Sequence, residues 1–213
     1  MTKKTALIIG ASGLVGKRLV QQLLQDERYE KITALVRTPL EIKHEKLTQT
    51  RYDFNWPNAD LAIGDELFCC LGTTIKKAGS QAAFRKVDYD YIVETAKIAL
   101  ANGAKKIAVV SSMGADKDSS IFYNRIKGET EAALQKLSYE ACYILRPSLL
   151  MGARDELRMG ELVGKLFMTA FAFAVPNKYK GIEGKQVAKA MIAIMNSNKV
   201  GFQIFESDAL RTF

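Results

Sequence analysis

Five short apolar runs separated by helical patterns constrain the fold of this chain more than any other feature. The runs are TALIIG at 5–10, ITALV at 32–36, ELFCCL at 66–71, KIAVVS at 106–111 and ACYIL at 141–145. Nearly continuous apolar strands are typical of a parallel sheet that is covered on both faces. Because helical patterns lie between the runs, the sequence predicts an α/β fold with a doubly wound parallel sheet.

Weaker signals complete the expected order of elements. A short strand is expected at 48–52, with a reduced helix on that flank of the sheet, because the connections there are short. The strands at 5–10 and 106–111 are expected to be parallel neighbours. We expect Ser119 or Ser120 to cap a helix that runs to about Leu137. The other expected elements are helices at 13–25, 81–101, 161–175 and 184–196 and a strand at 201–205.

Composition excludes several classes of protein. The chain has 213 residues, which suits one domain, and no run is long and apolar enough to span a membrane. The formal net charge of +8 comes from lysines in scattered pairs that aromatic residues do not interleave, which disfavours a nucleic-acid surface. Cys69, Cys70 and Cys142 form no disulfide framework, and the single His44 argues against a zinc site. We therefore expect a cytoplasmic protein without a bound metal.

The glycine-rich stretch GASGLVG at 10–16 directly follows the first strand and opens the first helix. A dinucleotide-binding loop requires this context, because small residues let the backbone approach the pyrophosphate and the helix N-terminus offers free N–H groups. The spacing is G-x-x-G-x-x-G, and a turn that serves only packing is the alternative. The expected cofactor contacts are Gly10, Ser12, Gly13, Leu14, Val15 and Gly16.

The end of the second strand indicates which dinucleotide is preferred. An acidic residue at this point binds the ribose 2′-hydroxyl of NAD, whereas an arginine accommodates the 2′-phosphate of NADP. The chain has Arg37 and Thr38 there, and no acid. The sequence therefore predicts NADPH (NADP) as the cofactor, and an ordinary surface arginine is the alternative.

Tyr123 and Lys127 stand four residues apart in FYNRIK, so they meet on one face of the predicted helix. This spacing alone is frequent in ordinary helices. With GASGLVG, VVSSMGAD and YNRIK in this order, however, the chain resembles the short-chain dehydrogenase/reductase superfamily. The motifs FCCLGTT, VDYDY, FYNRIKGE and LRPSLL resemble more closely its atypical members in the Tat-interacting oxidoreductase family.

The resemblance implies a Rossmann-type sheet with a small C-terminal cap, and it implies site residues. Catalysis falls on Ser112, Tyr123 and Lys127, with Ser111 as the alternative serine. Asp88 stands where better-known members carry an asparagine that relays protons, so the chain departs from the family pattern at this position. The further cofactor contacts that it implies are Asp53 and Phe54 at the adenine, Leu71, Gly72 and Thr73 along the adenine ribose, Pro147 and Leu149 near the nicotinamide, and Tyr123 and Lys127 themselves.

These residue types suit carbonyl reduction. Hydride transfer leaves negative charge on the carbonyl oxygen, to which Ser112 can donate a hydrogen bond, and Tyr123 can then supply the proton as general acid. A free phenol has a pKa of about 10. Lys127, one turn away, supplies a positive charge that favours the phenolate.

We expect one NAD(P)-binding domain over residues 1–213, with a cofactor-binding core at about 1–150 and a substrate cap with C-terminal elements at about 151–213. The predicted function is an NADPH-dependent oxidoreductase whose partner is a small-molecule carbonyl or alcohol substrate. An NADP(H)-binding regulatory or interaction protein with little or no turnover is the alternative, and the Ser112, Tyr123 and Lys127 set favours the enzyme. A homodimer or a protein partner is left open.

Overall fold

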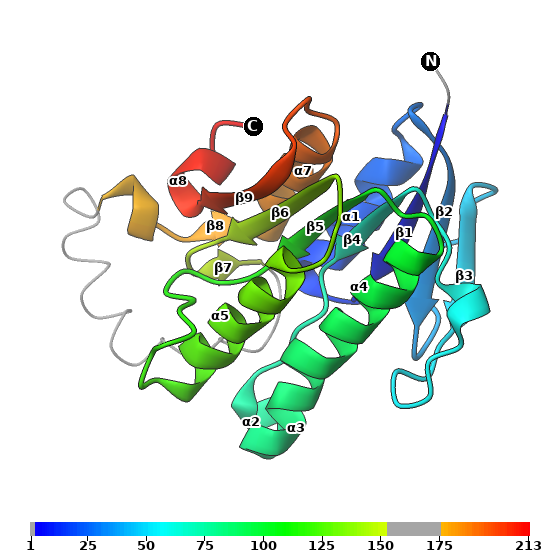
Figure 1. Ribbon diagram of the computed structural model, residues 1–213. Coiled ribbons are helices and arrows are strands. Elements are labelled where there is room, and N and C mark those ends of the chain that lie inside the picture. Colours follow the sequence, from blue (N-terminus) through cyan, green and yellow to red (C-terminus); the bar gives the residue numbers. More distant parts are fainter. Residues whose placement is uncertain (1–2, 153–175) are drawn as a thin grey trace.

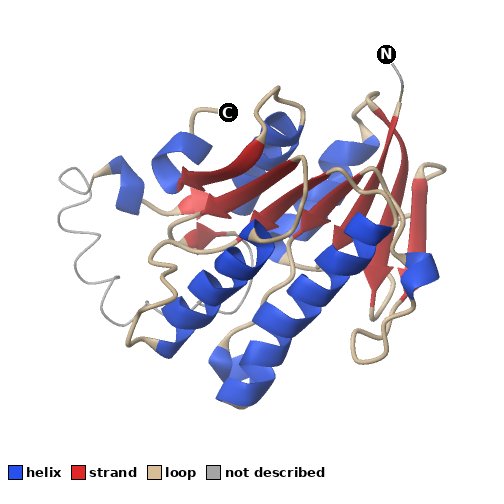
Figure 2. Ribbon diagram, viewed as in Figure 1, coloured by secondary structure: helices blue, strands red, loops and turns tan. Residues whose placement is uncertain are grey.

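The computed structural model, which describes residues 3–152 and 176–213, has a seven-stranded parallel sheet between two layers of helices (Figures 1 and 2). The strands lie in the order β3-β2-β1-β4-β5-β6-β9, so the direction of winding reverses between β1 and β4. The predicted α/β fold with a doubly wound parallel sheet is confirmed. The strands of this sheet are β1 (Lys4–Ile9), β2 (Tyr29–Val36), β3 (Leu47–Arg51), β4 (Glu66–Cys69), β5 (Lys106–Val110), β6 (Ala141–Arg146) and β9 (Gly201–Glu206).

Each face of the sheet has its own apolar core, because successive strand residues point to opposite sides. Ala6 and Ile8 of β1 pack in the core under α1 and α7, whereas Leu7 and Ile9 pack in the core under α4 and α5. In Figure 1, α4 and α5 lie in front of the sheet, and α1 and α7 lie behind it. The helices are α1 (Leu14–Leu24), α2 (Ile75–Ala78), α3 (Gln81–Arg85), α4 (Tyr91–Ala101), α5 (Phe122–Gln135), α7 (Gly184–Met195) and α8 (Ser207–Leu210).

The helix expected at 81–101 has an irregular turn. A π turn over Lys86–Asp90 joins α3 to α4 without a break in the helical path. Single π turns insert one residue into a helix and occur frequently at functional sites. This turn carries Asp88, which is fully buried.

The flank around β3 is reduced, as predicted. The connection between β3 and β4 contains only a short 3-10 helix, Ala59–Leu61, in place of a full crossover helix. The expectation that the first and fifth strands are neighbours was wrong. β4 lies between β1 and β5 and pairs with both in parallel, because the winding starts in the middle of the sheet and proceeds outward in both directions.

The expected N-cap of the helix that carries Tyr123 and Lys127 was also wrong. The N-cap of α5 is Ile121, and no side chain bonds the first turn. Ser119 Oγ instead accepts the backbone N–H of Ile121 at 3.1 Å, and the Arg125 guanidinium donates to the Ser119 carbonyl at 3.0 Å. The serine therefore forms a local turn that precedes the helix.

The C-terminal elements belong to the main layers of the fold. β9 extends the sheet beyond β6 in parallel, and α7 packs beside α1, where Gln22 Nε2 donates to the Lys185 carbonyl at 3.0 Å. A two-stranded parallel ribbon, β7 (Leu150–Met151) and β8 (Ile182–Glu183), and a 3-10 helix, Asn177–Tyr179, precede α7. The helix expected at 161–175 lies outside the described residues.

Candidate active site

The glycine loop between β1 and α1 is packed so tightly that it admits no side chain at two positions. Gly10 has a φ of +78°, and a Cβ there would lie 2.4 Å from the Cys70 carbonyl carbon. A Cβ on Gly16 would lie 2.1 Å from the Gly10 carbonyl oxygen. Gly13 donates its N–H to the same oxygen at 3.0 Å and caps α1 without a side-chain bond. The loop thus presents bare backbone at a helix N-terminus, which fits a pyrophosphate.

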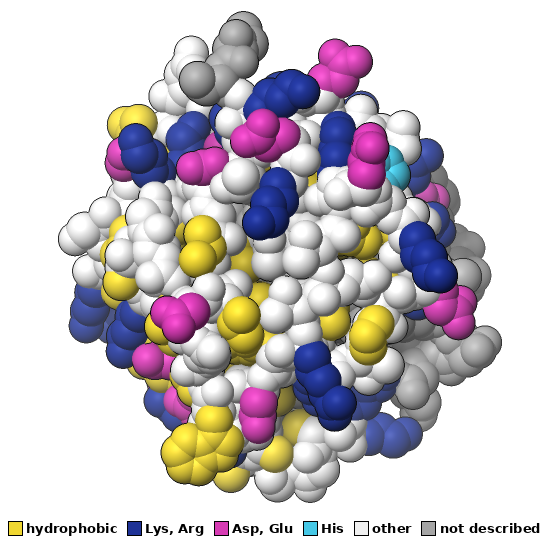
Figure 3. Space-filling view, turned by 90° about the vertical axis from the view of Figure 1, so that its right-hand side faces the viewer, with side chains coloured by type: hydrophobic (Ala, Val, Ile, Leu, Met, Phe, Trp, Pro, Cys, Tyr) yellow, Lys and Arg dark blue, Asp and Glu magenta, His cyan; other side chains and the backbone are white. Residues whose placement is uncertain are grey.

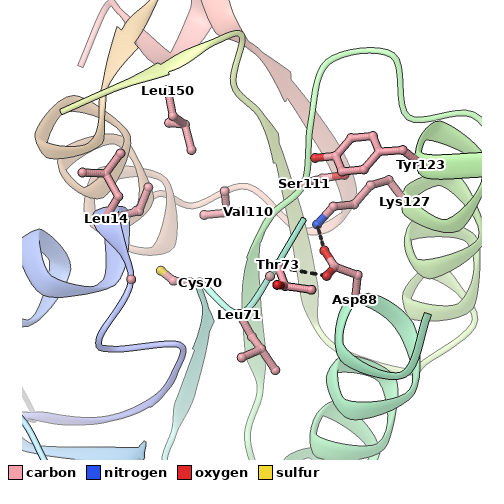
Figure 4. A pocket seen from close by; sticks show the side chains of 13 residues that line it. Leu14, Cys70, Leu71, Thr73, Asp88, Val110, Ser111, Tyr123, Lys127 and Leu150 are labelled. Atoms are coloured by element: carbon pink, nitrogen blue, oxygen red, sulfur yellow. Dashed lines mark hydrogen bonds and ion pairs between the residues drawn. The ribbon is translucent and has the colours of Figure 1, made fainter. Parts of the chain in front are cut away.

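A pocket opens beside this loop, where the winding of the sheet reverses. Ligands of open α/β sheets bind at such a point, outside the carboxyl ends of the strands. In Figure 4, Leu14 and Leu150 lie on one side of the pocket, and Tyr123, Lys127 and Asp88 lie on the other. The lining residues are Gly13, Leu14, Val15, Cys70, Leu71, Gly72, Thr73, Asp88, Val110, Ser111, Tyr123, Lys127 and Leu150.

Tyr123 and Lys127 reach the pocket from successive turns of α5. The Tyr123 ring packs against the buried Phe84 ring of α3, with a centroid separation of 5.4 Å. The Lys127 side chain is 7% exposed, and its Nζ lies 2.8 Å from Asp88 Oδ1 in an ion pair. The two residues that were predicted as the catalytic couple therefore face one cavity, together with Asp88.

The pKa of Lys127 lies above its ordinary value of 10.5. Burial is the largest single influence and lowers this pKa, but the charges of Asp88 and then Tyr123 raise it, and their effects prevail. The lysine is therefore an ammonium at neutral pH although it is buried.

The two serines after β5 differ in what their hydroxyls do. Ser111 lines the pocket, and its Oγ donates to Glu131 Oε1 at 2.5 Å, so its one proton is engaged. Ser112 is outside the lining set, and its Oγ is buried without a hydrogen-bond partner among the described residues. A hydroxyl has a single donor proton, so Ser112 is the serine whose proton is still available.

A second ion pair holds Glu131, the acceptor of the Ser111 hydroxyl, in place. Glu131, one turn after Lys127 in α5, binds the Arg146 guanidinium of β6 through Nε and Nη2, the latter at 2.5 Å. Arg146 also reaches Glu206 of β9 at 3.3 Å. Glu131 was not identified from the sequence, although its spacing from Lys127 placed it on the face that carries the predicted catalytic residues.

Several predicted cofactor contacts lie outside the pocket wall. Arg37 and Thr38 are exposed at the end of β2. Asp53 is exposed, and its Oδ1 accepts the N–H of Asn55 at 2.9 Å. Phe54 is half-buried, with its ring centroid 5.4 Å from that of Tyr91. The remaining predicted contacts outside the wall are Gly10 and Gly16, which shape the loop, the exposed Ser12, the buried Pro147 and the exposed Leu149.

Three wall residues, Cys70, Val110 and Leu150, were not predicted as site residues. Cys70 directly follows β4 and Val110 ends β5, so their place at the carboxyl ends of adjacent central strands was the signal that indicated them. Leu150, the first residue of β7, carries no comparable signal, because nothing in the sequence distinguishes this apolar residue from one that lies outside a site. Burial raises the pKa of the Cys70 thiol well above its ordinary value, so this thiol is neutral.

The surface on the side of β3 carries lysine and arginine side chains dispersed among acidic ones, with no continuous basic patch in view (Figure 3). Over residues 3–152 and 176–213, no three His, Cys, Asp or Glu side chains are grouped as a metal site would require. Within the same ranges no helix has the length and apolarity that crossing a membrane demands.

Comparisons with known proteins agree with this geometry. The NAD(P)H-binding family matches residues 10–198. The chain is 37% identical to protein HTATIP2 of Rattus norvegicus over 188 residues, which are 83% of this chain and 77% of that protein. It is 32% identical over 205 residues to the mitochondrial protein FMP52 of Eremothecium gossypii, covering 92% and 91% of the two chains. Among solved structures, MoeE5 in complex with UDP-glucose and NAD is similar with a TM-score of 0.72 at 16% identity, over 94% of this chain and 75% of that one.

Proposed function

Because the chain belongs to the NAD(P)H-binding family and to the atypical short-chain dehydrogenases/reductases, we propose that it is an NADPH-dependent oxidoreductase that reduces a small carbonyl compound. One observation carries this proposal. Tyr123 and Lys127 face the same pocket as the glycine loop and the segment 71–73. A phenol and an ammonium beside a dinucleotide loop are the groups that carbonyl reduction needs from the protein.

The preference for NADPH rests on Arg37. Its guanidinium is exposed at the carboxyl end of β2, and neither Val36 before it nor Thr38 after it is acidic. A guanidinium offers a planar set of donors that matches a phosphate, whereas a ribose hydroxyl is better bound by a carboxylate.

Each catalytic side chain has a defined role in this proposal. The bound nicotinamide would supply the hydride. Ser112 adjoins the wall residue Ser111, and its buried Oγ would have to turn toward the pocket to donate a hydrogen bond to the carbonyl oxygen as negative charge develops there. Tyr123 would hold the proton that this oxygen finally takes. Lys127 would stabilise the phenolate that remains and would bind the cofactor ribose, so Lys127→Ala is expected to impair both turnover and cofactor affinity.

Tyr123→Phe tests the proposal. The change deletes one hydroxyl and keeps the ring that packs on Phe84, so the fold and NADPH affinity are expected to survive while turnover is abolished. Tyr139→Phe is the matched control, because its hydroxyl donates to the Ala96 carbonyl at 2.6 Å, in the core under α4 and α5. NADPH oxidation is followed with a panel of aldehydes and ketones, and NADPH binding by fluorescence titration.

The outcomes separate the two functions. Turnover that disappears in Tyr123→Phe and persists in Tyr139→Phe supports the reductase. Tight NADPH binding without turnover of any carbonyl in the wild type would favour a cofactor-binding regulatory protein. Wild-type turnover in Tyr123→Phe would remove the tyrosine from the reaction.

A further inference from the structure

Asp88 is a fully buried carboxylate whose two oxygens hold two different segments of the site. Oδ1 lies 2.8 Å from Lys127 Nζ, and Oδ2 accepts the backbone N–H of Thr73 at 2.8 Å (Figure 4). The carboxylate thus joins the loop after β4 to α5. Both contacts are made by the Asp88 side chain and not by the backbone hydrogen bonds of the sheet and helices.

The π turn that carries Asp88 is itself fastened to α5. Thr130 Oγ1 donates to the Asp88 carbonyl at 2.8 Å. A Cβ on Gly72 would lie 3.2 Å from Asp88 Oδ1 and 3.6 Å from Lys127 Nζ, so the backbone of the loop lies directly over the ion pair. The pair is therefore enclosed, and water has little access to either charge.

Enclosure makes the charge of Lys127 dependent on its neighbours, because burial alone favours a neutral amine. The titratable groups that act on Lys127 are Asp88 on the π turn, Tyr123 on its own helix and Cys69 of β4. Burial raises the pKa of Cys69 to about 12, so this thiol is neutral. Asp88 is thus the one carboxylate of this group that opposes the desolvation of the lysine.

We propose that Asp88 is a positioning residue that keeps the buried Lys127 ammonium charged and fixed against the pocket, and that ties the segment 71–73 to the same point. It acts through Lys127 and Thr73. This inference rests on the proposed function, in which Lys127 binds the cofactor ribose and tunes Tyr123. An asparagine at this position would keep the shape of the side chain and lose its charge, so it isolates the contribution of the charge.

Asp88→Asn tests the proposal, with Asp90→Asn as control. Asp90 lies in the same turn but is exposed, so its loss leaves the lysine unchanged. NADPH affinity is titrated from about pH 6 to about pH 9. In Asp88→Asn the lysine is expected to lose its proton within this range. From the acid to the alkaline end of the range, the NADPH dissociation constant of Asp88→Asn should therefore rise about tenfold more than that of the wild type. At the acid end, protonation of the lysine should restore most of the affinity. The pH profile of Asp90→Asn should parallel that of the wild type.

A second measurement on the wild type needs no folded variant at position 88. The NMR signal of isotope-labelled Lys127, assigned by its absence in Lys127→Arg, should show a charged ammonium up to about pH 10. Titration of this signal near neutral pH, or a wild-type pH dependence of binding in Asp88→Asn, would overturn the inference. If the wild type does not bind NADPH, the proposed function fails, and the Lys127 signal alone still decides the role of Asp88.

Discussion

Substitution of Gly16 by alanine tests whether the glycine loop is built for a dinucleotide. The new Cβ would lie 2.1 Å from the Gly10 carbonyl oxygen and 2.9 Å from the Ala11 Cα. Nonbonded carbon and oxygen atoms require about 3.2 Å or more, so the loop must move by roughly 1 Å. Overpacking of this kind costs about 1–3 kcal/mol. For a chain of this size, 2 kcal/mol corresponds to a fall in Tm of about 4–8 °C.

The displaced atoms are also those that would meet the cofactor. The Gly10 carbonyl oxygen accepts the N–H of Gly13, and Gly13 lines the pocket. Movement of this oxygen therefore distorts the loop at the helix N-terminus. NADPH affinity is therefore expected to fall at least about tenfold, which is about 1.4 kcal/mol. Thermal denaturation and fluorescence titration of NADPH measure the two effects. Lys17→Ala, an exposed change at the next position of α1, should alter neither. Wild-type Tm and affinity in Gly16→Ala would refute the proposed fit of the loop to a pyrophosphate.

Three further predictions concern the choice of cofactor, the hydrogen bond to the carbonyl oxygen and the buried ion pair. Arg37→Ala is expected to weaken NADPH by about 1.5–3 kcal/mol and NADH much less, because one charge-assisted contact is lost; equal losses in parallel titrations would contradict this role. Ser112→Ala should lower turnover by about 10²–10³-fold at unchanged NADPH affinity, whereas Ser111→Ala should lower it less, since Glu131 already holds that proton. The pKa of Lys127 is raised above 10.5, so its contribution to stability is complete below that pH and is lost as the pH rises through the folded-state value. Denaturant unfolding of the wild type and Lys127→Met should accordingly differ by a constant amount at neutral pH and converge in strong alkali.

The layered fold was predictable because the strands of a buried parallel sheet consist of nearly continuous apolar residues. TALIIG and KIAVVS need no partner information to be recognised, and the glycine loop is a local feature of consecutive residues. The lateral order of strands is different, since it depends on which edges pair after the chain has crossed the sheet. That is why the expected adjacency of β1 and β5 was wrong although both strands were located.

The π turn shows a second limit of sequence reasoning. The stretch from Gln81 to Ala101 has continuous helical periodicity, and nothing in it indicates one inserted residue. The insertion is stabilised by contacts with segments distant in sequence, namely the Thr130 hydroxyl on the Asp88 carbonyl and Lys127 on the Asp88 side chain. A departure from the expected asparagine was visible at position 88, but only the packed structure shows what its charge meets.

The depth at which α5 sits decides whether Tyr123 and Lys127 reach the pocket. Tyr123, Lys127 and Glu131 repeat every four residues, so they share one face of the helix. Gly128 lies within this span, and a Cβ there would lie 2.1 Å from the backbone nitrogen of Lys117. Only glycine lets α5 approach the loop after β5 so closely. Because Lys127 then meets Asp88 and Glu131 meets Arg146, each charge on this face is matched by one from another element. The position of the helix is thereby set by two ion pairs and one missing side chain, and Tyr123 is carried to the pocket as a consequence.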